Sequence, residues 1–290
     1  MQLSSLQLKL VPMSGKLYNI LVPVDFTAKN KWAIAKAIEL SNSFHCNIHL
    51  VHVTGRRQRI FNRNNYAEAA LEKLVQIKDL YRQQICGEGS IEISVLNGNR
   101  QKQLVNYIQQ YDMDLVITGL PKFNLIQRIV SSISISRLAK KTNVPVLAIR
   151  ASGLVCHFKK IVLPVSGEIP MRQIRLATLL GRAYKSTVYF VSLRKHADNK
   201  NEQILDKALE VVQSISTIPV QCFLLEGQNL AKSTLEFSKK INADLIMVNP
   251  IKDFRLPGLW NRITNKLLSY GSKIPVVTVA QNNMATDTTR

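Results

Sequence analysis

Short apolar runs alternate with longer amphipathic segments along the first half of the chain. Residues 20–24 form an apolar run that ends at Asp25, as expected for a buried parallel strand followed by a polar loop. An apolar stripe at helical spacing follows in residues 33–44. By the same criteria, the further expected strands are 47–53, 92–96, 115–118 and 144–149, and the further helices are 67–85, 101–110 and 129–140. This alternation predicts right-handed crossovers and a doubly wound, five-stranded parallel sheet.

The second half repeats the first. Residues 18–25 resemble 159–166, 114–119 resemble 244–249, and 143–149 resemble 273–279, in the same order. Such a recurrence indicates a tandem duplication, with one loop shortened in the second copy. The second copy predicts strands at 161–165, 186–193, 218–225, 244–248 and 275–279, and helices at 170–184, 202–215, 229–241 and 259–270.

The chain therefore reads as an α/β protein of two tandem domains. We expect an N-terminal extension at 1–16, a first domain at 17–150, a linker at 151–158, a second domain at 159–281 and a C-terminal tail at 282–290. Hydrophobic residues make up 46% of the chain, which is typical of globular domains and not of disordered ones. No apolar stretch is long enough to span a bilayer.

The net charge is +20. Lys and Arg outnumber Asp and Glu by 20 to 9 before residue 153 and by 19 to 10 after it, so the excess is spread over both halves. Such a field attracts nucleic acid, anionic membrane surfaces or nucleotides, and it also simply maintains solubility. Charge alone does not choose between these interpretations.

Catalytic and metal-binding patterns are missing from the sequence. There is no phosphate-binding GxxxxGK[ST] motif, paired nucleophile or carboxylate cluster, so we expect no enzyme activity. His49 and His52 lie on one predicted strand but face opposite sides, which argues against a shared metal ion. Four cysteines without CxxC spacing indicate a reduced, cytoplasmic protein with buried thiols.

Ligands of open parallel sheets bind beyond the carboxyl ends of the strands, where the strand order reverses. The candidate positions are therefore Asp25, residues 53–57, Asn97 with Gly98, and residues 118–122. The loop after the second strand also carries Arg56, Arg57, Arg59 and Arg63. Such a loop contacts phosphate or is a solvated basic segment.

Four ordered segments, VPVDF, LVHV, DLVITG and NVPVLAIR, make the chain similar to the universal stress protein family in its tandem form. The resemblance implies a fold like that of adenine-nucleotide-binding α/β domains, with ATP or AMP as ligand and magnesium only as its companion. It also implies that the last strands of the two domains, 144–149 and 275–279, pair within the chain as a pseudo-two-fold dimer, which would cover two sheet edges.

Transferred position by position, the family's site is partly kept in the first copy. Pro23, Val24 and Asp25 match the end of the first strand, Val53 matches the residue whose backbone meets adenine, and Thr118 and Gly119 match the start of the glycine motif. Lys122 and Ser132 replace the second and third glycines of that motif. Because glycines let backbone N–H groups approach phosphate, their loss weakens the phosphate cradle. The alternative is a vestigial pocket in which Asp25 caps the following helix.

The second copy has lost more of the motif. Ser166 replaces Asp25, Asn249 and Pro250 follow the fourth strand, and Lys252 and Arg262 take the later glycine positions. This half is expected to be a structural partner.

Three function classes follow for the whole chain. The first is a non-enzymatic stress-response protein with a weakened adenine-nucleotide site in domain 1. The second is a nucleotide-independent adaptor for protein partners. The third is a basic polyanion-binding protein.

Overall fold

The structure is a computed structural model that describes residues 16–55, 63–120, 133–150, 157–194, 199–250 and 273–280. The first half alternates strands and helices, as the hydrophobic pattern predicts. Its elements are β1 (Asn19–Val24), α1 (Lys29–Phe44), β2 (Asn47–Thr54), α2 (Arg63–Arg82), β3 (Ile91–Asn97), α3 (Arg100–Gln110), β4 (Leu115–Gly119), α4 (Ile135–Thr142) and β5 (Val146–Ile149).

The second half follows the same order. Its elements are β6 (Lys160–Pro164), α5 (Met171–Tyr184), β7 (Thr187–Leu193), α6 (Lys200–Ile215), β8 (Val220–Leu225), α7 (Leu230–Lys240), β9 (Leu245–Val248) and β10 (Val276–Thr278). The predicted helix at 259–270 lies outside the described residues, as does the beginning of the one at 129–140.

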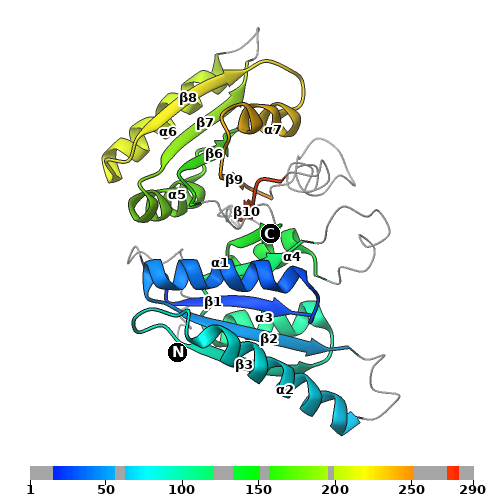
Figure 1. The fold of residues 1–290 in the computed structure, drawn as a ribbon. Helices are drawn as coiled ribbons and strands as arrows, with labels where there is room; N and C mark the ends of the chain where they lie inside the picture. Colours follow the sequence, from blue (N-terminus) through cyan, green and yellow to red (C-terminus); the bar gives the residue numbers. More distant parts are fainter. Residues whose placement is uncertain are drawn as a thin grey trace, which may run out of the picture.

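The ten strands of the described residues form one sheet, in the order β3-β2-β1-β4-β5-β10-β9-β6-β7-β8 (Figure 1). Within each half the strands are parallel and have equivalent orders, which confirms two tandem, doubly wound, five-stranded units. The halves join where β5 and β10 run antiparallel, with Leu147 opposite Val277. The two units thus share a continuous sheet with β3 and β8 at its outer edges.

Helices cover both faces of the sheet. One hydrophobic cluster contains buried residues of α1, α2, α5 and α6 and extends across both halves. On the other face, α3 and α4 pack on a cluster in the first half, and α7 packs on a cluster in the second. Because paired residues of β5 and β10 point to the same face, the three-layer arrangement continues through the junction.

The duplicated landmark before β4 and β9 has a structural role. The Asp114 carboxylate accepts hydrogen bonds from the backbone N–H groups of Tyr18, at 2.7 Å, and Asn19, at 3.0 Å. In the second half, Asp244 accepts one from the N–H of Lys160 at 2.9 Å. Each carboxylate therefore ties the start of its fourth strand to the start of its first.

Polar and charged side chains also tie the halves together. The Arg172 guanidinium, at the start of α5, donates to the carbonyl of Ala280 at 2.5 Å and to that of Asn143, which ends α4 in the other half. Lys36 of α1 is fully buried, with its ammonium 2.5 Å from Glu39 and 4.8 Å from the centre of the Phe158 ring. The junction thus extends beyond the two paired strands.

The three described cysteines are free thiols, but their burial differs from the prediction. Cys46 is buried, and burial, together with the nearby Asp114 charge, raises its pKa to about 12. Cys222 is half-buried, whereas Cys86 is exposed. The expectation of buried thiols is therefore wrong for Cys86, which follows α2 in the loop before the edge strand β3.

Candidate functional site

The predicted site centres on the loop between β1 and α1. In the sheet, β1 lies between β2 and β4. The strands that follow β1 are therefore added first on the β2 side and then on the β4 side, so the strand order reverses at β1. Ligands of such sheets bind beyond this point. Asp25 follows β1 directly and Gly119 ends β4, so the structure brings these two predicted residues to the same edge.

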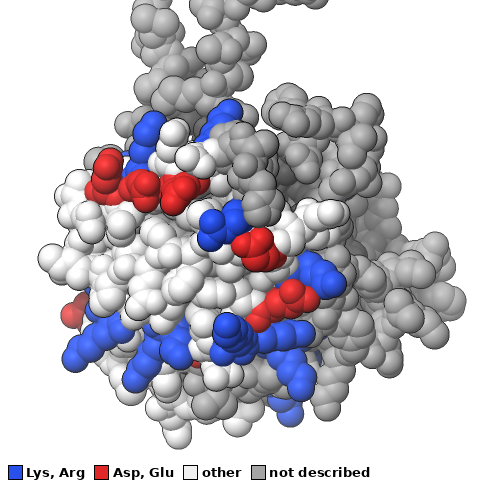
Figure 2. All heavy atoms as spheres, turned by 90° about the horizontal axis from the view of Figure 1, so that it is seen from above, with Lys and Arg blue, Asp and Glu red and all other residues white. Residues whose placement is uncertain are grey.

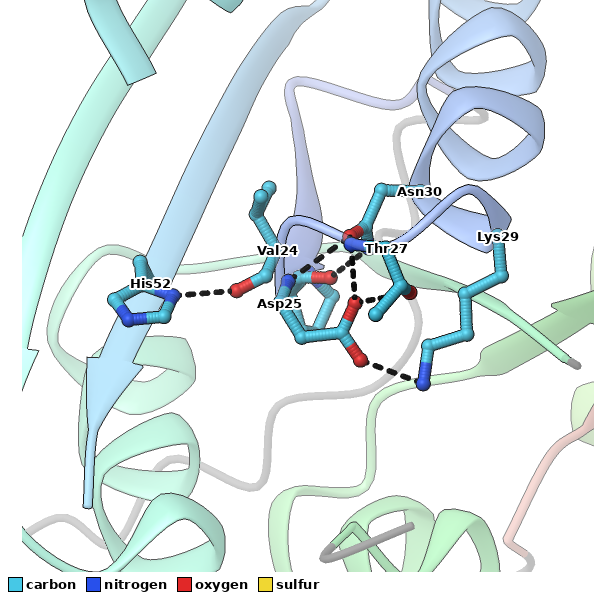
Figure 3. A network of polar contacts seen from close by, with 7 residues as sticks. Val24, Asp25, Thr27, Lys29, Asn30 and His52 are labelled. Carbon is cyan, nitrogen blue, oxygen red and sulfur yellow. Dashed lines mark hydrogen bonds and ion pairs between the residues drawn. The ribbon is translucent and has the colours of Figure 1, made fainter. Parts of the chain in front are cut away.

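A buried asparagine fixes the shape of this loop. The Asn30 side-chain oxygen accepts from the backbone N–H groups of Asp25, at 3.0 Å, and Thr27, at 3.1 Å. Its amide nitrogen donates to the carbonyl of Pro23 at 3.1 Å (Figure 3). Asn30 is only 4% exposed, and its one side chain supplies the hydrogen-bond partners of three backbone groups in this loop.

The Asp25 carboxylate is held by its neighbours. One oxygen accepts from the hydroxyl of Thr27 at 2.6 Å and from its N–H at 3.2 Å, and the other lies 2.6 Å from the Lys29 ammonium (Figure 3). Burial acts to raise the pKa of Asp25, but the Lys29 and Thr27 hydrogen bonds and the Lys29 charge lower it overall. Helix α1 begins after Ala28 without a side-chain cap, so the alternative of Asp25 as a helix cap is wrong.

A histidine and an aromatic ring lie beside this pair. The His52 Nδ1 donates to the carbonyl of Val24 at 2.8 Å, and its ring centre lies 4.5 Å from that of Phe26. Since a carbonyl oxygen only accepts, Nδ1 carries the proton and Nε2 offers a lone pair. Nε2 is buried without a hydrogen-bond partner among the described residues. Burial lowers the pKa of His52 below its ordinary 6.5, although the bond to Val24 opposes this.

The remaining predicted residues have structural surroundings. Val53 is buried on the α3 face, and Thr118 is half-buried within β4. Gly119 lies against the start of α1, where an added Cβ atom would be 2.1 Å from the Lys29 carbonyl oxygen. This close approach requires a glycine whether or not phosphate binds. Lys122 and Ser132 lie outside the described residues.

The equivalent edge of the second half is simpler. The Ser192 hydroxyl donates to the carbonyl of Val165 at 2.8 Å, in the place of the bond between His52 and Val24. Ser166 stands in the place of Asp25, so this loop has no carboxylate at that position. The loss of the site in domain 2 therefore includes the imidazole as well as the acid.

The other singled-out residues do not converge on a site. His49 bonds through Nδ1 to the hydroxyl of Tyr107 at 3.0 Å, on the α3 face, whereas His52 bonds to Val24. The two histidines thus lie apart, as predicted. Among the described residues there is no group of three potential metal ligands, and no helix there is long and apolar enough to cross a membrane. Trp32 packs against the core, and Trp260 and residues 56–62 are not described.

The model of the universal stress protein family matches residues 17–150. Residues 17–150 therefore form a domain of the universal stress protein family. This membership supports a role in stress responses. No curated protein matches the sequence.

Solved structures extend the likeness to both halves. A universal stress protein from Archaeoglobus fulgidus DSM 4304 is 13% identical with a TM-score of 0.69, and the alignment covers 91% of this chain and 98% of that one. A functionally unknown protein from Pseudomonas aeruginosa PAO1 is 15% identical with a TM-score of 0.63, covering 92% and 93%. At these identities the likeness establishes the fold alone.

Sequence reasoning missed Phe26, Lys29, Asn30 and the role of His52. The positions of these residues relative to Asp25 depend on the turn after β1 and on the pairing of β1 with β2. The one available signal was the predicted orientation of His52, opposite to that of His49.

Proposed function

We propose that this protein acts without catalysis in stress adaptation, and that domain 1 binds an adenine nucleotide weakly at the carboxyl end of β1. The observation that carries the proposal is the ion pair between Asp25 and Lys29 at the point where strand order reverses. A carboxylate there accepts ribose hydroxyls, and an ammonium attracts phosphate.

The neighbouring residues fit the base better than the phosphates. The buried Nε2 of His52 has no donor among the described residues, and an exocyclic amine such as that of adenine would supply one. The Phe26 ring beside it provides an apolar face. Gly119, in contrast, is closed off by the Lys29 carbonyl. AMP or ATP is the ligand class that these groups support, with magnesium only as a companion of the phosphates.

Weak binding follows from the contacts that Asp25 already makes. Its carboxylate accepts two hydrogen bonds from Thr27 and pairs with Lys29. A nucleotide must compete with these groups, and part of its binding energy offsets their loss. We expect a dissociation constant on the order of 10 micromolar, so that millimolar nucleotide is about 100 times that value.

The absence of catalysis is inferred from the chemistry of the described groups. Asp25 is an ionised carboxylate paired to a lysine, and the imidazole beside it, that of His52, is buried with a lowered pKa. The Thr27 hydroxyl donates to Asp25, but a carboxylate whose pKa is lowered is a weak base for activating that hydroxyl as a nucleophile. Incubation with ATP and quantification of released phosphate tests this directly, and turnover lost in Asp25→Ala would contradict it.

Thermal unfolding with added nucleotide tests binding. A ligand at about 100 times its dissociation constant adds about 2.7 kcal/mol to stability, so ATP or AMP should raise the melting temperature of the wild type by several degrees. Asp25→Ala should abolish the shift, and the matched Ser166→Ala in domain 2 should keep it. No shift at millimolar nucleotide would exclude the site.

A nucleotide-independent adaptor is the second candidate. It is favoured by the same contacts of Asp25, because a carboxylate with three partners needs no ligand. An adaptor would retain its protein partners in a pull-down from stressed cells when Asp25 is replaced by Ala. If Asp25→Ala loses those partners, with or without added nucleotide, the adaptor function is contradicted.

The charge distribution favours polyanion binding as a third candidate. Helices α3, α4 and α7, on one face of the sheet, carry eight Lys and Arg residues and a single acid, Glu236. Binding to nucleic acid should then fall steeply as salt rises. Salt-insensitive or absent binding would exclude this role. Cytoplasmic location stays a prediction from the cysteine pattern and is tested by cell fractionation.

A further inference from the structure

The two outer edges of the ten-stranded sheet have different chemistry. They are β3 in the first half and β8 in the second, and each pairs with one neighbouring strand among the described residues. Because the halves are duplicates, the edges are compared position by position through their registers with β2 and β7. Each edge strand therefore has an equivalent in the other half of the same chain.

The β3 edge carries a charge that β8 has lost. Glu92, which is exposed in β3, corresponds to Gln221 in β8, and Ser94 corresponds to Phe223. Charged side chains on edge strands prevent pairing with other chains. The β8 edge therefore lacks a protection that its duplicate retains.

The loss of charge extends beyond the strand. Residues 211–225, from the end of α6 through β8, contain no Asp, Glu, Lys or Arg in a chain of net charge +20. Ile215 is 41% exposed and Phe223 is 37% exposed. Figure 2, which looks down on the end of the molecule that carries β8, shows an area without charged side chains, with acidic and basic residues gathered toward its margins.

The backbone of β8 has groups available for pairing. The carbonyls of Pro219 and Leu225 accept from the N–H groups of Val188 and Arg194 in and after β7. In a parallel ladder, alternate residues turn their N–H and C=O groups to the same neighbour. Odd-numbered residues therefore face β7, and Val220, Cys222 and Leu224 turn theirs outward.

The exposed aromatic ring is held in place for contact. The Phe223 ring centre lies 5.0 Å from that of Phe237 and 6.2 Å from that of Tyr189. An anchored aromatic residue on an edge strand contributes apolar area with little loss of side-chain freedom. The edge thus combines outward backbone groups, which pair with no other strand among the described residues, with a fixed hydrophobic side chain.

We propose that β8 pairs antiparallel with β8 of a second copy of this chain, which makes a symmetric dimer with a continuous sheet. The chain already joins equivalent halves in this way, because β5 and β10 pair antiparallel at the junction. Antiparallel pairing about a two-fold axis brings Val220 opposite Leu224 of the other copy and exchanges their outward groups.

Charge argues for a second copy over another occupant. Two chains of net charge +20 repel each other at most surfaces. An uncharged strip lets two such chains meet without opposing like charges, whereas an acidic partner would be drawn to the basic helices instead. Since salt screens the remaining repulsion, the dimer should become tighter as ionic strength rises, the opposite of polyanion binding.

The test is sedimentation of the full chain from low to high micromolar concentration, at low and high salt. The wild type should reach twice the chain mass of 32.7 kDa. Gln221→Glu, which restores the charge found at Glu92, should weaken the dimer at least about tenfold, because the new charge is present twice across a symmetric interface. Gln109→Glu adds the same charge on an exposed position of α3 and should leave the dimer unchanged.

Amide exchange measured by NMR identifies the surface. The N–H groups of Val220, Cys222 and Leu224 should be protected in the dimer and should exchange quickly in Gln221→Glu. Phe223→Ser is a second variant with the same expected result. A wild type that stays monomeric throughout would overturn the proposal, as would a dimer that persists in both variants with these amides unprotected.

Discussion

Gly119 offers a direct test of how β4 packs against α1. The family motif assigns this glycine to phosphate binding, whereas the structure gives it a packing role. An added Cβ atom would lie 2.1 Å from the carbonyl oxygen of Lys29 and 2.7 Å from its carbonyl carbon. Both are backbone atoms of the first turn of α1, so a side-chain rotation does not relieve the clash. Gly119→Ala should therefore force β4 and α1 apart.

The size of the effect follows from the overlap. Extra atoms in a packed interior typically destabilise by about 1–3 kcal/mol, and occasionally by more. Because the contact is shorter than a normal separation by more than 1 Å, we expect the upper end, about 3 kcal/mol. For a domain of this size, 1 kcal/mol corresponds to roughly 4 °C in melting temperature, so Gly119→Ala should lose about 12 °C.

Urea unfolding monitored by circular dichroism measures the loss, without nucleotide. Gly55→Ala is the matched control, because no atom of the described residues lies within 4 Å of the added Cβ atom there. Its free energy of unfolding should stay within about 1 kcal/mol of the wild type. Equal stability of the Gly119→Ala and Gly55→Ala variants would refute the close approach and restore phosphate binding as the reason for the glycine.

Four further predictions concern charge and the junction. The pKa of Asp25 is lowered below its ordinary 3.8, so the stability that its charge contributes is present above pH 3.8 and is lost as the pH falls through the pKa of the folded state. In urea unfolding, Asp25→Asn should therefore be less stable than the wild type near neutral pH and equally stable in strong acid. Equal stability of the two proteins at both pH values would contradict this. The lowered pKa of His52 favours the neutral imidazole. The stability that the neutral ring provides above pH 6.5 is therefore lost as the pH falls through the pKa of the folded state. A titration midpoint of His52 above 6.5, measured by NMR, would contradict the burial of the ring. Arg172→Leu leaves the carbonyls of Ala280 and Asn143 without their donor and should destabilise by about 2–4 kcal/mol. After proteolytic cleavage within 151–158, the two halves of the wild type should stay associated on gel filtration. The halves of Arg172→Leu should separate in dilute solution. Separation of the wild-type halves would contradict a stable junction.

The sequence was sufficient for the order and type of the elements, because buried parallel strands read as short apolar runs. The first strand was predicted at 20–24 and is Asn19–Val24, and the strand predicted at 186–193 is Thr187–Leu193. The ends of the strands differ by one or two residues, because polar residues such as Asn19 continue the ladder. The helix predicted at 67–85 is Arg63–Arg82, because its polar first turn adds nothing to the apolar stripe from which the helix was predicted. The repeated aspartates were visible as landmarks, but their bonds to the first strands were not.

The site was harder to predict because its contacts join residues through a turn and a neighbouring strand. A carboxylate after β1 was visible in the sequence, whereas its pairing with Lys29 depends on where α1 begins. The clearance at Gly119 depends on the distance between β4 and the first turn of α1. Hydrophobic periodicity carries no information on either distance. The family motif therefore predicted phosphate binding at Gly119, whereas the structure places the backbone of Lys29 against this glycine.

The proposed function requires one nucleotide-binding site in domain 1, at Asp25, and none at the equivalent Ser166 in domain 2. Equilibrium dialysis of the full chain against labelled AMP measures this as a stoichiometry. We predict one molecule per chain for the wild type and for Ser166→Ala, and none for a folded Asp25→Ala variant. No binding at millimolar AMP, two molecules per chain, or undiminished binding by Asp25→Ala would contradict the account.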